Sequence, residues 1–336
     1  MPAYEGRWED GYAAKMSDLT ASDLLEVAPG CFVLRYPEWD VSIGVVVGSD
    51  GVLVVDTRAS GTQGRRLADD VRRVAPGADV RWVVNTHQHF DHTFGNSAFD
   101  GASVHAHENA AAGLVGAGDR IKAMIRADPS VDPAYPAITP EVLDELLATQ
   151  YRLPNATFSS AAVIDLGDRY VELAYPGRGH TDGDLVLRVP DADVVFGGDL
   201  IEQSAHPSFG TDCYPLEWPG SLDLMIGMLT EASVVVPGHG TPVTREFVQD
   251  QRADVSDVAQ LISSLYAQGV PESDALLVGA QETTGWPFPS EDLAEAVRRG
   301  YAQLAADAAD AAALGDPLAF RSPARPPAGA AGLPLV

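Results

Sequence analysis

The stretch from residue 86 to residue 92 reads THQHFDH and contains three of the chain's eight histidines. Zinc and similar divalent ions bind imidazole nitrogen and carboxylate oxygen in proteins, at about 2 Å. In the H-x-H pair, His87 and His89 can reach one ion together. The pair Asp91 and His92, displaced along the chain, can serve a second ion beside the first. This spacing predicts a metal site rather than a chance cluster of surface histidines.

Three further candidate ligands come directly after apolar runs. His180 lies in PGRGHTDGD, Asp199 lies in VVFGGDL, and His239 lies in VVVPGHGTP. Open sheets place their binding sites at the carboxyl ends of strands, so we expect these side chains to meet the first motif there. Glycines beside them allow the backbone to turn tightly and to approach an ion closely.

With THQHFDH, GHTDGD, GGDL and PGHG in this order, the sequence resembles the metallo-β-lactamase superfamily of metallo-hydrolases over about residues 25–245. The resemblance implies an α/β fold, an αββα sandwich of two mixed β-sheets flanked by helices. It also implies a ligand set of seven residues for two divalent ions. His87, His89 and His180 would hold the first ion, Asp91, His92 and His239 the second, and Asp199 would bridge them.

Zinc is the metal that we expect first, with iron or manganese as alternatives. Two such ions can share a water, lower its pKa towards 7 and supply a bridging hydroxide for hydrolysis. By its role in the family, Asp91 would orient this nucleophile and pass a proton. The complete ligand set favours a binuclear hydrolase that cleaves an ester, thioester, lactone or amide bond in a small molecule, as glyoxalase II and quorum-sensing lactonases do.

Three alternatives stay open. Zinc β-lactamases are one, although several carry cysteine at the place of Asp199, and those lack a histidine at the place of His92. A mononuclear iron enzyme of the persulfide dioxygenase kind shares parts of the motif. A non-catalytic member that keeps the fold as a binding module is the third alternative.

Three residues are candidate substrate contacts. His206 lies in a proline-containing loop that follows Asp199, and Tyr214 and Trp218 lie shortly after it. Each of them can instead be packed in the core or lie on the surface. His105 and His107 alternate along an expected strand, and we expect packed or surface histidines there rather than ligands.

Strands rich in valine alternate with helical stretches. We expect three strands between residues 31 and 56 with a turn at 49–51, and further strands at 80–84, 102–106, 161–165, 169–174, 185–189, 193–197 and 233–236. Helices are expected at 60–75, 246–268 and 290–313. The catalytic domain would cover 20–250, with a proline-punctuated helical insert at 108–150 that is placed to form a wall or lid. A helical extension would follow at 251–315, then a disordered tail at 316–336.

The composition restricts the partners. With 22 basic and 48 acidic residues, the formal net charge is −26, which disfavours nucleic acid and anionic membranes. No apolar run approaches the roughly 20 residues of a membrane span, and no secretory signal is recognisable. The two cysteines do not form a disulfide framework. These features favour a cytoplasmic enzyme with a small-molecule substrate and leave the oligomeric state open.

Overall fold

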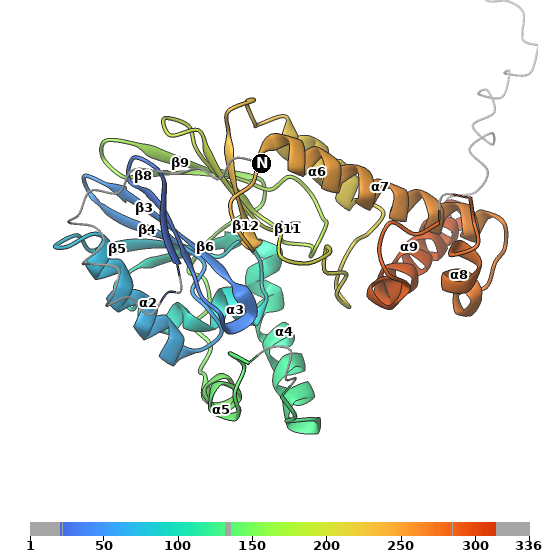
Figure 1. Cartoon of the computed structure of the whole chain (residues 1–336), viewed down its shortest axis with the longest axis horizontal. Helices are drawn as coiled ribbons and strands as arrows, with labels where there is room; N and C mark the ends of the chain where they lie inside the picture. The colour runs from blue at the N-terminus through green and yellow to red at the C-terminus, as the bar shows by residue number, and fades with distance from the viewer. Residues whose placement is uncertain (1–20, 22, 132–135, 284, 314–336) are drawn as a thin grey trace, which may run out of the picture.

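The computed structural model describes residues 21, 23–131, 136–283 and 285–313. Within these residues, two β-sheets lie face to face with helices against both outer sides (Figure 1). This is the αββα sandwich that the sequence predicts. The expected tail at 316–336 lies outside the described residues.

The first sheet has seven strands in sequential order among the described residues. They are β1 (Asp23–Ala28), β2 (Cys31–Arg35), β3 (Ser42–Gly48), β4 (Gly51–Val55), β5 (Val80–Val84), β6 (Ser103–His107) and β7 (Ala156–Phe158). Neighbours pair antiparallel from β1 to β4 and parallel from β4 to β7. The three strands expected between residues 31 and 56 are β2, β3 and β4, and Gly48 pairs with Gly51 across the expected turn.

The second sheet has five strands in the order β12-β11-β10-β9-β8 among the described residues. Their bounds are β8 (Ala161–Asp165), β9 (Tyr170–Ala174), β10 (Val186–Val189), β11 (Val194–Glu202) and β12 (Val234–His239). The strand expected at 193–197 therefore continues to Glu202. A register shift beside Gly198, whose φ is 53°, allows β11 to pass the two glycines and to stay paired with β12.

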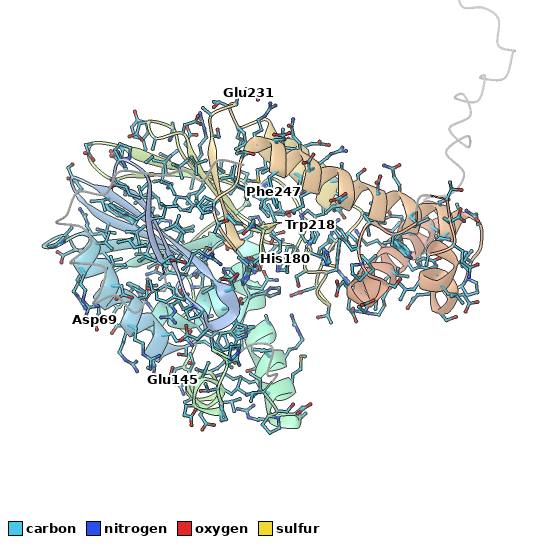
Figure 2. All side chains as sticks on the ribbon, viewed as in Figure 1. Asp69, Glu145, His180, Trp218, Glu231 and Phe247 are labelled. Atoms are coloured by element: carbon cyan, nitrogen blue, oxygen red, sulfur yellow. The ribbon has the colours of Figure 1, made fainter. Side chains whose placement is uncertain are left out.

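Three apolar layers hold the sandwich together. Side chains such as Leu53 and Phe196 fill the space between the two sheets. On the outer face of the first sheet, Leu67 and Val71 of α2 (Gly61–Val74) pack against the strands, as the amphipathic pattern of 60–75 predicts. The outer face of the second sheet packs against α6 (Trp218–Ile226) and α7 (Arg245–Ala267). Figure 2 shows how densely side chains fill these layers.

The insert at 108–150 is helical, as expected, and contains α4 (Glu108–Ala127) and α5 (Pro140–Ala148). Thr139 caps α5 by accepting a hydrogen bond from the Val142 amide, and Pro140 occupies the first turn, where a missing N–H costs little. Both helices project from the lower end of the sandwich, close to the short helix α3 (Phe90–Thr93) (Figure 1). The insert therefore lies next to the first histidine motif.

The C-terminal helices α8 (Glu272–Gly279) and α9 (Ala294–Ala313) lie at the far end of α7, away from the first sheet (Figure 1). The expected boundary between residues 250 and 251 falls inside α7. One apolar core runs from Val235 of β12 through Ile262 of α7 to Val297 of α9. The helical extension is therefore continuous with the sandwich. No helix in the described ranges is both long enough and apolar enough to cross a bilayer.

Candidate metal centre

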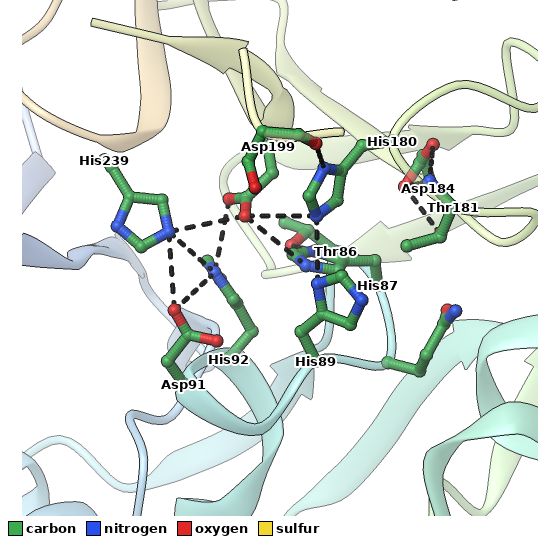
Figure 3. Close-up of polar contacts among 12 residues, drawn as sticks. Thr86, His87, His89, Asp91, His92, His180, Thr181, Asp184, Asp199 and His239 are labelled. Carbon is green, nitrogen blue, oxygen red and sulfur yellow. Dashed lines mark hydrogen bonds and ion pairs between the residues drawn. The ribbon is translucent and has the colours of Figure 1, made fainter. Parts of the chain in front are cut away.

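The seven expected ligands meet at one end of the sandwich, between the two sheets (Figure 3). His87 and His89 lie between β5 and α3, Asp91 and His92 lie in α3, and the other three come from the second sheet or follow one of its strands. Of the latter, His180 follows β9, Asp199 lies within β11, and His239 is the last residue of β12. The structure thus brings together all the ligands that the resemblance implies.

The ligand atoms form two groups, and in each group the atoms lie within 4.8 Å of one another. The groups are His87, His89, His180 and Asp199, and Asp91, His92 and His239. Asp199 contacts both: its Oδ2 lies 3.4 Å from His180 Nε2 and 3.3 Å from His239 Nε2. Its Oδ1 lies 3.2 Å from His92 Nε2 (Figure 3). A single carboxylate therefore stands between the two groups.

Hydrogen bonds on the outer side fix the tautomers of His87 and His92. The Thr86 hydroxyl donates to Asp56 at 2.8 Å, so it accepts from His87 Nδ1 at 3.0 Å. His92 Nδ1 donates to the same Asp56 carboxylate at 2.8 Å. Both rings therefore direct an Nε2 lone pair towards the centre.

In each of the other three histidines, one ring nitrogen is likewise hydrogen-bonded and the other faces the centre. The Nδ1 atoms of His180 and His239 donate to the carbonyl oxygens of Ser208 and Trp39 at 2.9 and 2.7 Å, which leaves Nε2 free. His89 is reversed, because its Nε2 donates to Asp212 at 3.2 Å and its Nδ1 faces inward. Neutral imidazole with one nitrogen so anchored is the usual form of a metal-binding histidine.

Two observations indicate that metal ions fit this arrangement. His87 Nε2 and Asp199 Oδ1 are buried atoms without a hydrogen-bond partner. An unsatisfied buried polar group costs about 1–3 kcal/mol, and a cation would satisfy both atoms. In addition, His89 Nδ1 and His180 Nε2 lie 2.9 Å apart, a separation at which two lone pairs repel without a cation between them. The set of nitrogen and oxygen donors suits zinc.

Electrostatics favour positive charge at the centre. Burial lowers the pKa of His180 to about 4, so this ring is neutral at pH 7 and its lone pair is available. Burial acts in the same sense on His239, but the Asp199 carboxylate outweighs it and raises the pKa of His239 to about 10. The carboxylates of the centre therefore require compensating cations, which divalent ions can supply.

Sequence reasoning did not identify the two carboxylates that orient these rings. Asp56 is almost fully buried and follows the apolar strand β4, just as Asp199 follows an apolar run, so its position carried a usable signal. Asp212 lies on a loop and accepts hydrogen bonds from His89, Gln88 and Arg120. Nothing in the local sequence distinguishes Asp212 from other loop carboxylates.

We expect Asp212→Ala to weaken binding of the first ion about 10- to 100-fold, because His89 loses the acceptor that holds its Nδ1 inward. A titration of the metal-free protein against a chromophoric chelator measures this affinity. Asp292→Ala is a matched control, because Asp292 also pairs with a histidine, His206, but at an exposed site. Equal metal affinities of the two variants would contradict the positioning role.

The three candidate substrate contacts are not among the described residues that line the cavity beside the metal centre. His206 is half exposed and pairs with Asp292 at 3.1 Å. The ring of Tyr214 contacts the guanidinium groups of Arg178 and Arg299, 4.4 and 4.9 Å from its centroid. Trp218 is fully buried, so it has no surface for a substrate; its ring packs against His180, with centroids 5.8 Å apart (Figure 2). Trp218 therefore supports a ligand instead.

A cavity of about 610 Å³ opens beside the centre, and its described lining includes none of these three candidates. Its floor contains five of the expected ligands: His89, Asp91, His180, Asp199 and His239. The insert contributes Ser130, Val131 and Ile138 to the wall. Of the remaining histidines, His107 is buried and stacks on Tyr175, as expected for a packed residue.

The sequence model of one protein family, the metallo-β-lactamase superfamily, matches residues 36–239. This is over half of the sequence, so the chain belongs to this superfamily. It is 25% identical over 202 residues to metallo-β-lactamase type 2 of Bacillus sp. (strain 170), covering 59% of this chain and 66% of that protein. It is 26% identical over 211 residues to acyl-coenzyme A thioesterase MBLAC2 of Bos taurus, covering 59% of this chain and 72% of that protein.

A solved structure shares the fold. The stereoselective inverting sec-alkylsulfatase of Pseudomonas sp. superposes with a TM-score of 0.65 at 17% identity, covering 83% of this chain and 50% of that chain. Against four type 2 β-lactamases, the matches span between 36% and 66% of those proteins. The chain therefore has the family, the fold and a His/Asp cluster that could hold metal ions.

Proposed function

We propose that this protein is a binuclear metallo-hydrolase that cleaves an ester, thioester, lactone or amide bond in a small molecule. The observation that supports it most is the Asp199 carboxylate, which lies within 3.4 Å of ligand atoms in both groups. In this proposal Asp199 would be shared by two zinc ions, with iron or manganese as alternatives. His87, His89 and His180 would hold the first ion, and Asp91, His92 and His239 would hold the second.

When bound, such ions lower the pKa of a water and polarise the oxygen of the scissile bond. The chain itself supplies a proton carrier. Asp91 lines the cavity, and its Oδ2 lies 3.4 Å from His239 Nε2 and 3.5 Å from His92 Nε2. Its carboxylate would accept the proton of the attacking water and pass it to the leaving group. The water oxygen bonds to the acyl carbon as the leaving group departs.

We expect about two transition-metal ions per chain in metal-replete protein, because two ligand groups share one bridging carboxylate. Elemental analysis together with an accurate protein concentration measures this ratio. One tightly held iron would favour the dioxygenase alternative, and no metal would favour a non-catalytic binding module. Hydrolysis rates with a panel of lactones, esters, thioesters, amides, β-lactams and phosphodiesters then identify the bond that is cleaved.

The similarity to type 2 β-lactamases favours a second candidate function, cleavage of a β-lactam amide. Those relatives are 25% and 32% identical to the chain over 202 and 92 residues. The same substrate panel separates this candidate from the ester, thioester and lactone activities.

We also propose that the protein acts in the cytoplasm on a small-molecule substrate, with no nucleic-acid or membrane partner. The net charge of −26 supports the exclusion of polyanions.

A further inference from the structure

The cavity has an apolar wall that is built from three separate segments. Trp39 comes from the segment before β3, Phe90 begins α3, and Val131 and Ile138 come from the stretch between α4 and α5. The rings of Trp39 and Phe90 meet edge to face with centroids 5.2 Å apart. Together with Pro37, these side chains line the cavity beside the expected ligands. A cavity of about 610 Å³ has the size of a small-molecule site.

Main-chain contacts at Trp39 connect this wall to the expected ligand His239. Trp39 has a φ of 59°, a left-handed conformation that a bulky residue adopts only when its surroundings hold it. The adjacent Glu38 pairs with buried Arg58 at 2.8 Å, and the Trp39 carbonyl accepts the His239 Nδ1 proton at 2.7 Å. The indole therefore has a fixed place relative to the expected ligand His239.

The charged side chains of the wall are all acidic. Besides the expected ligands, the ionisable residues in the described lining are Asp40 and Glu202. No lysine or arginine belongs to that described lining. The nearby cations are engaged in other contacts: Arg35 pairs with Asp40 of the lining, Lys122 is buried and donates to the Thr149 carbonyl, and Arg120 pairs with Asp212. Apart from the expected ligands, no side chain in the described lining thus offers a cation to an anionic group on a substrate.

We propose that the substrate presents an uncharged, largely apolar acyl or alkyl group to the wall of Trp39, Phe90 and Ile138. An anionic group at this distal end of the substrate weakens binding. This inference rests on the proposed hydrolase function. Metal ions attract the oxygen of the scissile bond, so the rest of the wall decides which distal group is accepted. Carboxylates of β-lactams and phosphates of coenzyme A are groups that this wall disfavours.

Matched pairs of esters test the inference on the zinc-replete full chain. Aryl butyrate is compared with the aryl monoester of succinate, and aryl hexanoate with the aryl monoester of adipate, so that only the terminal carboxylate differs. We expect kcat/KM to rise about threefold for each methylene from acetate to hexanoate, because each one is buried on the wall. We expect the anionic member of each pair to react at least about tenfold more slowly. Equal or faster reaction of the anionic members would overturn the proposal.

A binding measurement separates this inference from the proposed function. Calorimetry with hexanohydroxamate and with the monohydroxamate of adipic acid compares the same two distal groups without turnover. Tighter binding of the neutral compound supports the wall even if no ester, thioester, lactone or amide is hydrolysed, a result that would sink the hydrolase proposal alone. Tighter binding of the anionic compound would overturn the inference while hydrolysis stands.

Adding a cation to the wall gives a matched pair of variants. Val131 lines the cavity and is 37% exposed, whereas Val115 on α4 is 40% exposed and lies outside the lining. We expect Val131→Lys to shift the ratio of anionic to neutral ester cleavage about fivefold in favour of the anion, and Val115→Lys to leave it unchanged. An equal shift in both variants, or none in Val131→Lys, would contradict the assignment of the wall.

Discussion

Asp199→Asn is expected to lower kcat about a hundred- to a thousandfold and to lower the occupancy of the second ion. An amide keeps the shape of the side chain but removes the charge that faces His92, His180 and His239, and an uncompensated buried site costs several kcal/mol. The sequence suggested that Asp199 follows its strand on a loop. The structure places it inside β11 and almost fully buried, so the stability of the variant is expected to change as well.

Metal titration and kinetics on the same preparations test this role. Asp223→Asn is the control, because Asp223 is a carboxylate on α6 that pairs with Arg252 at the surface. Asp199→Cys is expected to keep zinc but to lose preference for iron and manganese, which favour oxygen ligands. If Asp199→Asn retains two ions and normal turnover, the bridging role is wrong.

Gly238→Ala is expected to reduce metal occupancy, to lower kcat about a hundredfold and to destabilise the fold by about 1–3 kcal/mol. A Cβ at this position would lie 1.8 Å from Asp199 Oδ1 and 3.0 Å from the Asp199 amide nitrogen. Neither β12, which carries the next residue His239, nor β11 can move away without disturbing a ligand. The carboxylate must therefore rotate out of the space between the two groups.

Denaturant unfolding, metal analysis and steady-state kinetics report the three effects separately. Gly220→Ala provides the matched change, because a Cβ at Gly220 in α6 meets no atom within 4 Å. Alanine is favoured over glycine in a helix, so this control is expected to be neutral or slightly stabilising. A Gly238→Ala protein with full metal content would show that the carboxylate has room that the structure does not indicate.

The gathering of the expected ligands was predictable because residue type and position agree for each of them. His87, His89 and His92 follow a buried strand at spacings that bring their rings to one place, and His239 ends another strand. A strand that ends in a polar residue after an apolar run has a clear sequence signature. Most strands and several helices follow from the alternation of periods, the two-sheet sandwich follows from the resemblance, and the structure confirms both.

Features without such a signature were missed. The strands β1 and β7 lie at the two edges of the first sheet, and β7 has only three residues. Helix α6 begins with Trp218 and Pro219, residues that suggest a loop although proline is tolerated in a first turn. The carbonyls of Trp39 and Ser208 orient ligands far away along the chain, and a backbone oxygen leaves no trace in the sequence.

Both ligand groups draw on both sheets. His87 and His89 follow β5 of the first sheet and meet His180, which follows β9 of the second, and His92 of α3 likewise meets His239 of β12. An ion in either place therefore acts as a cross-link between the halves of the sandwich. By linkage, an ion at a hundred times its Kd adds about 2.7 kcal/mol to the free energy of unfolding. In a cell that is short of metal, the protein would then lose activity, and more of it would unfold and be degraded by proteases. The metal supply of the cell would therefore set how much of the protein persists.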